Sequence, residues 1–233
     1  MNLHLFSTPG ENNIRYIIEA SRPYLSGKSD ASIAFLPQAW LNVKHWLDYT
    51  VRQFEGSGRV ELINTEQMDL PKMESIIRRA QAVYISGGNT FLLNHRLHIS
   101  RLMPHIRKKV QAGLPVVGFS AGMILCGPNI LTSSDLNSVG TSYFDGLKAT
   151  PFNFFAHYAK DSYGQALQDD WLSDYHVFNE NPVIMSCEGA YVKVEGKKTS
   201  LVRGEAWILR KDQEKEKLKE GKLIVLQEAY DGR

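Results

Sequence analysis

A serine between two glycines, placed directly after a short apolar run, most constrains what this chain can fold into. The run Leu-Pro-Val-Val at 114–117 leads into Gly-Phe-Ser-Ala-Gly at 118–122, and an apolar stretch follows. A buried strand that turns sharply into a helix at Ser120 explains this order of residues. Such a turn lifts the hydroxyl out at the carboxyl edge of a sheet. We therefore interpret Ser120 as a candidate nucleophile, with a plain tight turn as the alternative reading.

Short apolar runs alternate with helical patterns in the first half of the chain. The expected strands are residues 3–7, 32–37, 60–63, 82–85 and the run before Ser120, and the expected helices are 14–20, 43–54, 70–80 and 91–113, the last interrupted near Pro104. This alternation predicts a mostly parallel sheet with helices on both faces. Ligands of such sheets bind beyond the carboxyl ends of the strands, where both the serine turn and Gly-Gly-Asn-Thr at 87–90 fall.

The second half of the chain reads as further strands around one helix. The apolar run 152–156 ends at His157, a helix is expected at 163–172, and a strand at 182–185 leads to Glu188-Gly189. Runs at 191–194 and 199–202 flank Glu-Gly-Lys-Lys and predict a C-terminal β-hairpin. Runs at 206–209 and 223–226 are candidate strands, and the mixed-charge segment 211–222 between them reads as a solvated helix or tail. We expect residues 1–233 to form one domain.

Composition narrows the class of protein. The 233 residues are 43% hydrophobic and 22% charged, which is ordinary for a soluble globular domain. A net charge of +2 without a long basic patch argues against a nucleic-acid partner. Cys126 and Cys187 are too few for a disulfide framework. No signal peptide is recognised at the N-terminus and no apolar run is long enough for a membrane span, so we expect a cytoplasmic protein.

A serine hydroxyl becomes a useful nucleophile only when a base removes its proton. Of the seven histidines, His157 ends a strand-like apolar run, which places it on the edge expected for Ser120. The base in turn needs an orienting acceptor. Asp135 and Glu188 both compete for that role, and the position of Glu188 at the end of a strand favours it, which leaves Asp135 to shape the site. His95-x-x-His98 lacks a third metal ligand, so we expect no metal.

The Gly-Gly-Asn-Thr turn is best interpreted as part of an oxyanion hole. It lacks the spacing of a dinucleotide-binding loop and the lysine of a phosphate-binding loop. The backbone N–H groups of Gly88 and Ala121 can stabilise the negative charge of a tetrahedral intermediate, and one such donor is worth roughly 3 kcal/mol. Asn89 and Thr90 of the same turn are candidate substrate-binding residues.

Four segments together resemble peptidase E, a family of serine dipeptidases that remove an N-terminal aspartate and are related to cyanophycinases. The similarity covers most of the chain, in the order Gly87-Gly88-Asn89-Thr90-Phe91-Leu92-Leu93, Gly118-Phe119-Ser120-Ala121-Gly122, Ala156-His157-Tyr158 and Glu188-Gly189. The resemblance implies a flavodoxin-like three-layer fold, Ser120 as nucleophile and His157 as base. It implies Glu188 as the third member of the triad, and Asp135 matches an aspartate once proposed for that role.

One segment departs from the family pattern. Peptidase E carries an arginine-containing segment between the histidine and the glutamate that helps to recognise the substrate's aspartate. Here residues 158–187 contain no arginine, one lysine and several carboxylates. A pocket lined by this segment would favour a cation or a free amine over a carboxylate, which argues against strict aspartyl specificity.

The sequence therefore predicts a serine exopeptidase that acts on dipeptides or short peptides without a cofactor, as a monomer or a homodimer. An α/β-hydrolase esterase that uses Ser120, Asp135 and His157 is the alternative enzyme, although its histidine normally lies near the C-terminus. The third reading is a non-catalytic module that binds a ligand at the Gly-Gly-Asn-Thr edge. The presence of a serine, a histidine and carboxylates disfavours this reading.

Overall fold

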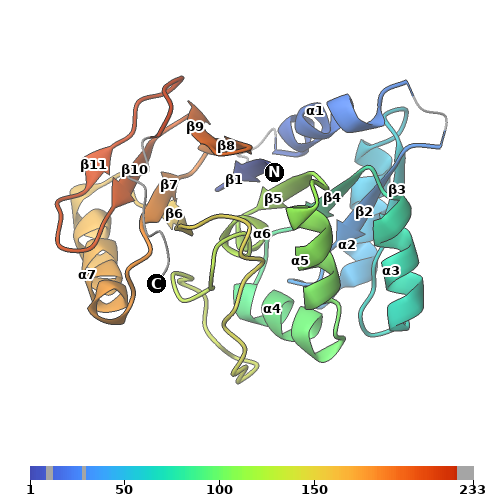
Figure 1. Cartoon of the computed structure of the whole chain (residues 1–233), viewed down its shortest axis with the longest axis horizontal. Helices are drawn as coiled ribbons and strands as arrows, with labels where there is room; N and C mark the ends of the chain where they lie inside the picture. Colours follow the sequence, from blue (N-terminus) through green and yellow to red (C-terminus); the bar gives the residue numbers. More distant parts are fainter. Residues whose placement is uncertain (9–12, 28–29, 225–233) are drawn as a thin grey trace.

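The computed structural model describes residues 1–8, 13–27 and 30–224 (Figure 1). The strands are β1 (Asn2–Phe6), β2 (Ser32–Leu36), β3 (Arg59–Leu62), β4 (Ala82–Ile85), β5 (Val116–Phe119), β6 (Asn153–Tyr158), β7 (Val183–Cys187), β8 (Tyr191–Glu195), β9 (Lys198–Arg203), β10 (Ala206–Leu209) and β11 (Glu216–Lys217). The helices are α1 (Asn13–Leu25), α2 (Val43–Gln53), α3 (Leu70–Arg79), α4 (Thr90–Ile99), α5 (Met103–Gln111), α6 (Ala121–Ile124) and α7 (Ser162–Phe178).

The larger sheet has the strand order β3-β2-β4-β5-β1-β8-β9. Strands β1 to β5 are parallel, with Leu5 opposite Gly118 and Ile85 opposite the same glycine on the other side. The β8–β9 hairpin continues the sheet antiparallel to β1. The predicted mostly parallel sheet and C-terminal hairpin are therefore confirmed. Because β1, β4 and β5 run in the same direction, the residues that follow them meet at one edge.

Helices cover both faces of the larger sheet. On one face, α1 and α2 enclose a core that includes Ile17, Phe35 and Phe54. On the other face, α3, α4, α5 and the short α6 enclose the largest core, which includes Leu93 and Ile106. Strands β2 and β4 are buried along their whole length, as expected for strands covered on both sides.

A second sheet with the order β11-β10-β7-β6 lies beside the first, and α7 packs on its outer face (Figure 1). Strands β6 and β7 are parallel, and β10 joins β7 antiparallel. Leu172 and Tyr175 of α7 are buried against Phe155 and Met185 of these strands. The sequence predicts β6, β7 and β10 as strands but does not indicate that they form a separate sheet.

The helix boundaries around α3, α4 and α5 follow capping and proline residues that the sequence shows. Asp69 caps α3 by accepting a hydrogen bond of 2.9 Å from the backbone N–H of Lys72. The predicted long helix 91–113 is interrupted after Ile99 and restarts at Met103, with Pro104 in the first turn of α5.

The helix or tail predicted for the charged segment 211–222 is wrong, although most of its residues are exposed to solvent as predicted. This segment contains the short strand β11 between turns, because it pairs with β10 and because Lys215 binds Asp169 of α7 and Tyr158 of β6. The expected strand 223–226 contributes one isolated bridge, between Leu223 and Ser200, and its last two residues lie outside the described ranges.

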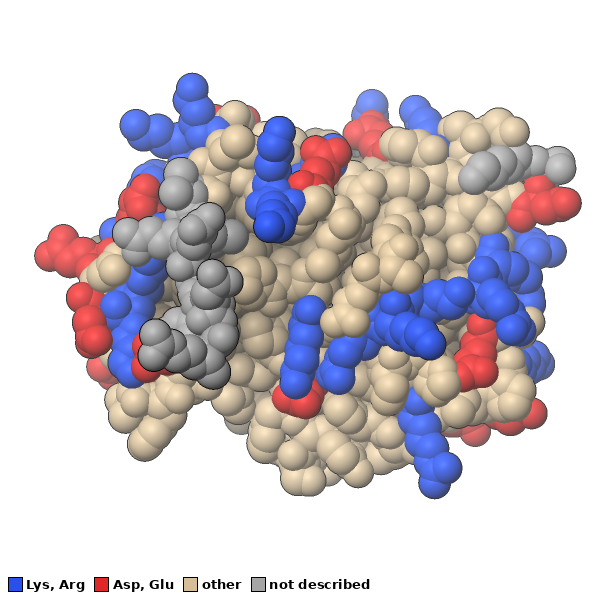
Figure 2. Space-filling view, in the orientation of Figure 1, with Lys and Arg blue, Asp and Glu red and all other residues tan. Residues whose placement is uncertain are grey.

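Charged side chains of both signs are spread over the face in Figure 2, with Lys and Arg side chains most frequent over α3 and α5. None of the described helices is long and apolar enough to cross a membrane.

Candidate active site

Ser120 occupies a strained turn between β5 and α6. Its φ of 49° and ψ of −108° are unfavourable for a residue with a side chain, and its backbone N–H donates a hydrogen bond of 2.8 Å to the carbonyl of Phe6. A Cβ atom on Gly122 would collide with the carbonyl oxygen of Ile85 in β4. Only glycine at position 122 therefore lets α6 start so close to the sheet.

The structure brings His157 to Ser120. The Nε2 atom of His157 lies 2.8 Å from Oγ of Ser120, which is hydrogen-bond distance. His157 is the penultimate residue of β6, at a bulge where the pairing with β7 shifts, and its φ is 62°. Ser120 and His157 therefore come from different sheets, each at the end of a strand.

Two residues just beyond β1 hold the imidazole segment. Oγ of Ser7 accepts a hydrogen bond of 2.8 Å from the backbone N–H of His157 and donates one of 2.8 Å to the carbonyl of Ser186. Oγ1 of Thr8 lies 3.3 Å from Nδ1 of His157. When the hydroxyl of Ser120 donates a hydrogen bond to Nε2 of the neutral ring, the ring proton is on Nδ1, which donates a hydrogen bond to Oγ1 of Thr8.

Burial and charge act in opposite directions on His157. Burial lowers the pKa of the imidazole below its ordinary value, while the negative charges of Glu188 and, to a lesser extent, Asp135 raise it. The net effect is a lowered pKa, so the ring is neutral and able to accept a proton at pH 7. Glu188 is exposed, and no described residue hydrogen-bonds to its carboxylate. Its influence on His157 is thus through charge.

Asp135 has a different environment from Glu188. One of its carboxylate oxygens accepts hydrogen bonds from the backbone N–H of Thr90, at 2.7 Å, and from Oγ of Ser133, at 3.0 Å. A carboxylate at the first turn of a helix also interacts favourably with the helix dipole. Asp135 therefore fastens the start of α4, and with it the glycine turn.

Asn89 and Thr90 are used within the protein. Asn89 caps α4 through its side-chain oxygen, which accepts from the N–H of Leu92 at 2.9 Å, and its amide nitrogen donates to the carbonyl of Leu136 at 2.9 Å. Thr90 is fully buried. Their predicted contact with substrate stays a prediction.

The glycine turn lies against the serine turn. A Cβ atom on Gly87 would be 3.1 Å from Cβ of Ser120, and one on Gly88, whose φ is 122°, would be 2.6 Å from the carbonyl oxygen of Ala39. Among the described residues, none accepts a hydrogen bond from the N–H of Gly88 or of Ala121. Both groups are thus available as oxyanion donors at the same sheet edge.

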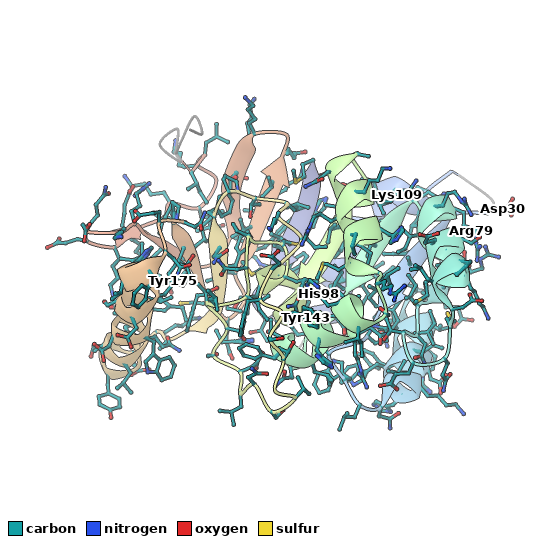
Figure 3. All side chains as sticks on the ribbon, turned by 60° about the horizontal axis from the view of Figure 1, so that its bottom comes forward. Asp30, Arg79, His98, Lys109, Tyr143 and Tyr175 are labelled. Carbon is teal, nitrogen blue, oxygen red and sulfur yellow. The ribbon has the colours of Figure 1, made fainter. Side chains whose placement is uncertain are left out.

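The remaining histidine pair serves the loop that carries Asp135. His98 stacks on Tyr143 with ring centroids 4.7 Å apart (Figure 3), and its Nε2 lies 3.1 Å from the carbonyl of Asp145. His95 lies 3.2 Å from the hydroxyl of Thr141. Within residues 1–8, 13–27 and 30–224, no group of three or more His, Cys, Asp or Glu side chains could hold a metal ion.

Sequence reasoning missed Ser7 and Thr8. Their signal is positional, because they directly follow the first strand and so fall on the same edge as Ser120. Gln168, whose amide contacts the backbone of His157, gives no signal, since a glutamine within a helix is ordinary.

Comparisons with known proteins agree with this geometry. The family model named peptidase family S51 matches residues 5–202. The chain belongs to peptidase family S51. It is a serine-type peptidase. A peptidase E of a Nostoc species is 30% identical over 203 residues, which cover 83% of this chain and 81% of the relative. A peptidase E of Pasteurella multocida is 24% identical over 86% of this chain and 88% of its own.

A Drosophila melanogaster protein named "Probable alpha-aspartyl dipeptidase" is 35% identical over 57% of each chain. Two crystal structures share the fold. A peptidase from an acI-B1 Actinobacterium superposes with a TM-score of 0.70 over 97% of this chain and 96% of its own, at 19% identity. A protein assigned to peptidase E from Listeria monocytogenes gives 0.68 over 87% of this chain and 98% of its own, at 20% identity.

Proposed function

We propose that this S51 peptidase is a dipeptidase that cleaves the bond after the N-terminal residue, with Ser120 as nucleophile and His157 as general base. The observation that carries the proposal is the 2.8 Å contact between Oγ of Ser120 and Nε2 of His157 at the strained turn. The hydroxyl attacks the peptide carbonyl while Nε2 takes its proton, and the imidazolium then protonates the leaving amine, which leaves the N-terminal residue as an ester on Ser120. Water that gives its proton to Nε2 then cleaves this ester, and the proton returns to Oγ of Ser120. The backbone N–H groups of Gly88 and Ala121 stabilise the oxyanion.

Glu188 is the proposed third member of the triad, acting through charge. Its carboxylate is the larger of the two anionic influences that raise the pKa of His157, and it is free of hydrogen bonds to the described residues. It therefore stabilises the imidazolium that forms during attack. Asp135 instead keeps the glycine turn in place, because one of its carboxylate oxygens accepts hydrogen bonds from Thr90 and Ser133.

The residue that the enzyme accepts at the N-terminus of its substrate depends on the charges around the site. The name of the Drosophila relative makes an Asp-X dipeptide the first substrate to test. The segment 158–187 lacks arginine, but Arg203 lies beside the Glu188-Gly189 turn, with Nε 3.4 Å from the carbonyl of Gly189. A cation at this edge can therefore come from β9. We propose that the enzyme acts in the cytoplasm, as a monomer or a homodimer.

The test combines substrates with variants. A dipeptide panel with Asp, Glu, neutral and basic first residues is measured with the wild type, Ser120→Ala, Glu188→Gln and Asp135→Asn. We expect Ser120→Ala to abolish turnover and Glu188→Gln to reduce kcat/KM about 10- to 100-fold. Asp135→Asn keeps an oxygen for the N–H of Thr90, so we expect a smaller loss. Full turnover by Ser120→Ala would refute the nucleophile, and the reverse order of the two acidic variants would refute Glu188.

A further inference from the structure

The base of the proposed mechanism sits on an unfavourable stretch of backbone. His157 has a positive φ at the point where β6 bulges away from its regular pairing with β7. A residue with a side chain adopts this conformation only where its surroundings enforce it. The direction of the imidazole, and hence its reach to Ser120, depends on whatever holds this bulge.

One side-chain amide bridges the bulge from α7. Oε1 of Gln168 accepts a hydrogen bond of 2.7 Å from the backbone N–H of Ala159, and its Nε2 donates one of 3.3 Å to the carbonyl of His157. A glutamine amide offers an acceptor and donors on one planar group, so a single side chain can satisfy both backbone groups. The two contacts fix the backbone immediately after the imidazole.

The helix that carries Gln168 is itself anchored at this point. Oδ1 of Asp169 accepts a hydrogen bond of 2.6 Å from the hydroxyl of Tyr158, and Nζ of Lys215 lies 2.7 Å from the same hydroxyl. One turn earlier, Nε2 of Gln165 donates to the carbonyl of Ala159 at 2.9 Å. The contacts of Asp169 with Tyr158 and Lys215, directly beside Gln168, therefore hold this part of α7 against β6.

We propose that Gln168 is a positioning residue for catalysis, which keeps Nε2 of His157 within reach of Ser120 by bridging the bulge. The proposal rests on the proposed Ser120–His157 chemistry. On the other side of the histidine, Ser7 accepts the hydrogen bond of the His157 N–H. Both backbone polar groups of His157 are thus held by side chains from different elements, one beyond β1 and one on α7.

Gln168→Leu is the direct test, and Gln165→Leu is its matched control. Both glutamines lie on α7, both are half-buried and both bind the backbone of Ala159, but only Gln168 contacts His157. We expect Gln168→Leu to lower kcat on the best dipeptide on the order of 10- to 100-fold, since small misplacements of a catalytic group have effects of this size. KM should change less than about twofold, because substrate contacts are untouched.

A second variant separates the two contacts and does not depend on how well the leucine variant folds. Gln168→Glu keeps an acceptor for the N–H of Ala159 but loses the donor to the carbonyl of His157 at neutral pH. We expect its kcat to be reduced as well. The rate of labelling of Ser120 by a fluorophosphonate should fall in parallel for both Gln168 variants, since this reaction needs the base but no peptide. Wild-type kcat in Gln168→Glu would overturn the proposal.

A double-mutant cycle with His157→Ala separates the positioning role of Gln168 from the catalytic role of His157. If Gln168 acts through His157, Gln168→Leu has no further effect in the His157→Ala background. Equal losses in Gln168→Leu and Gln165→Leu, or an undiminished effect of Gln168→Leu without the imidazole, would overturn the positioning role alone. Wild-type turnover in His157→Ala would instead refute the proposed function itself.

Discussion

Replacing Gly122 by alanine is the sharpest test of how the serine turn is built. A Cβ atom at this position would lie 2.9 Å from the carbonyl carbon of Ile85 and 3.0 Å from its Cβ, with the carbonyl oxygen closer still. Ordinary contacts begin near 3.4 Å. Ile85 is paired in the middle of the sheet with Leu36 and Gly118, so β4 cannot yield. The short helix α6 must move instead, by about 0.5 to 1 Å.

This movement affects stability and catalysis differently. Overpacking of this kind costs about 1–3 kcal/mol, offset by about 1 kcal/mol from the better helix propensity of alanine. For a chain of this size the expected fall in Tm is then only a few degrees. The N–H of Ala121 moves with α6, however, and the loss of one oxyanion donor costs about 3 kcal/mol in the transition state. We expect kcat/KM to fall by at least about 100-fold.

The assay is kcat/KM on the best dipeptide, together with thermal unfolding followed by circular dichroism. Gly221→Ala is the control, because the positive φ of 73° at Gly221 disfavours alanine, but no atom lies within 4 Å of its would-be Cβ. It should lose stability without losing activity. A Gly122→Ala enzyme with activity within threefold of the wild type would show that close packing of α6 on β4 is not needed to position the N–H of Ala121, the proposed oxyanion donor.

Two pH dependences follow from His157, which is half-buried, and from His4, which is buried. Because the pKa of His157 is lowered, we expect kcat/KM to fall toward acid pH with a single-proton slope whose midpoint lies below pH 6.5; a midpoint above pH 6.5 would contradict this. Burial between the hydroxyls of Tyr24 and Tyr191 lowers the pKa of His4 to about 4. The unfolded chain therefore binds a proton more readily, and about 3 kcal/mol of stability is present above pH 6.5 and lost progressively toward pH 4. Urea unfolding from pH 4.5 to 7.5 should show this slope in the wild type and a flatter one in His4→Phe.

The larger sheet and its active edge could be predicted because their signals are local. Buried parallel strands produce continuous apolar runs, and the turns that follow them carry the glycines at 87–88 and the Gly-x-Ser-x-Gly of the elbow. These features of the larger sheet need no knowledge of which strand pairs with which. The same rule does not account for the contact between His157 and Ser120, because β6 and β5 belong to different sheets.

The second sheet and the details around His157 could not be predicted, because they depend on pairings between distant segments. The apolar runs of β6 and β7 identify strands but not their partners. The charged segment around Lys215 has the composition of an exposed helix, and only its contacts with Asp169 and with β10 make it a strand. The side chain of Ser7 bonds to the backbone of both Ser186 and His157, and these three residues lie at the ends of three different strands.

The division of the catalytic pair between two sheets also has a consequence for when the enzyme becomes active during its synthesis. The serine is made 37 residues before the histidine, and β7, which pairs with β6, and β10, which pairs with β7, are made later still. Domains fold as their sequence leaves the ribosome. A nascent chain that has completed strands β1 to β5 thus carries the proposed nucleophile without the proposed base. If Ser120 and His157 act as proposed, we expect proteolytic activity only once β7 and β10 have been added, so that synthesis of nearly the whole chain precedes the first hydrolysis.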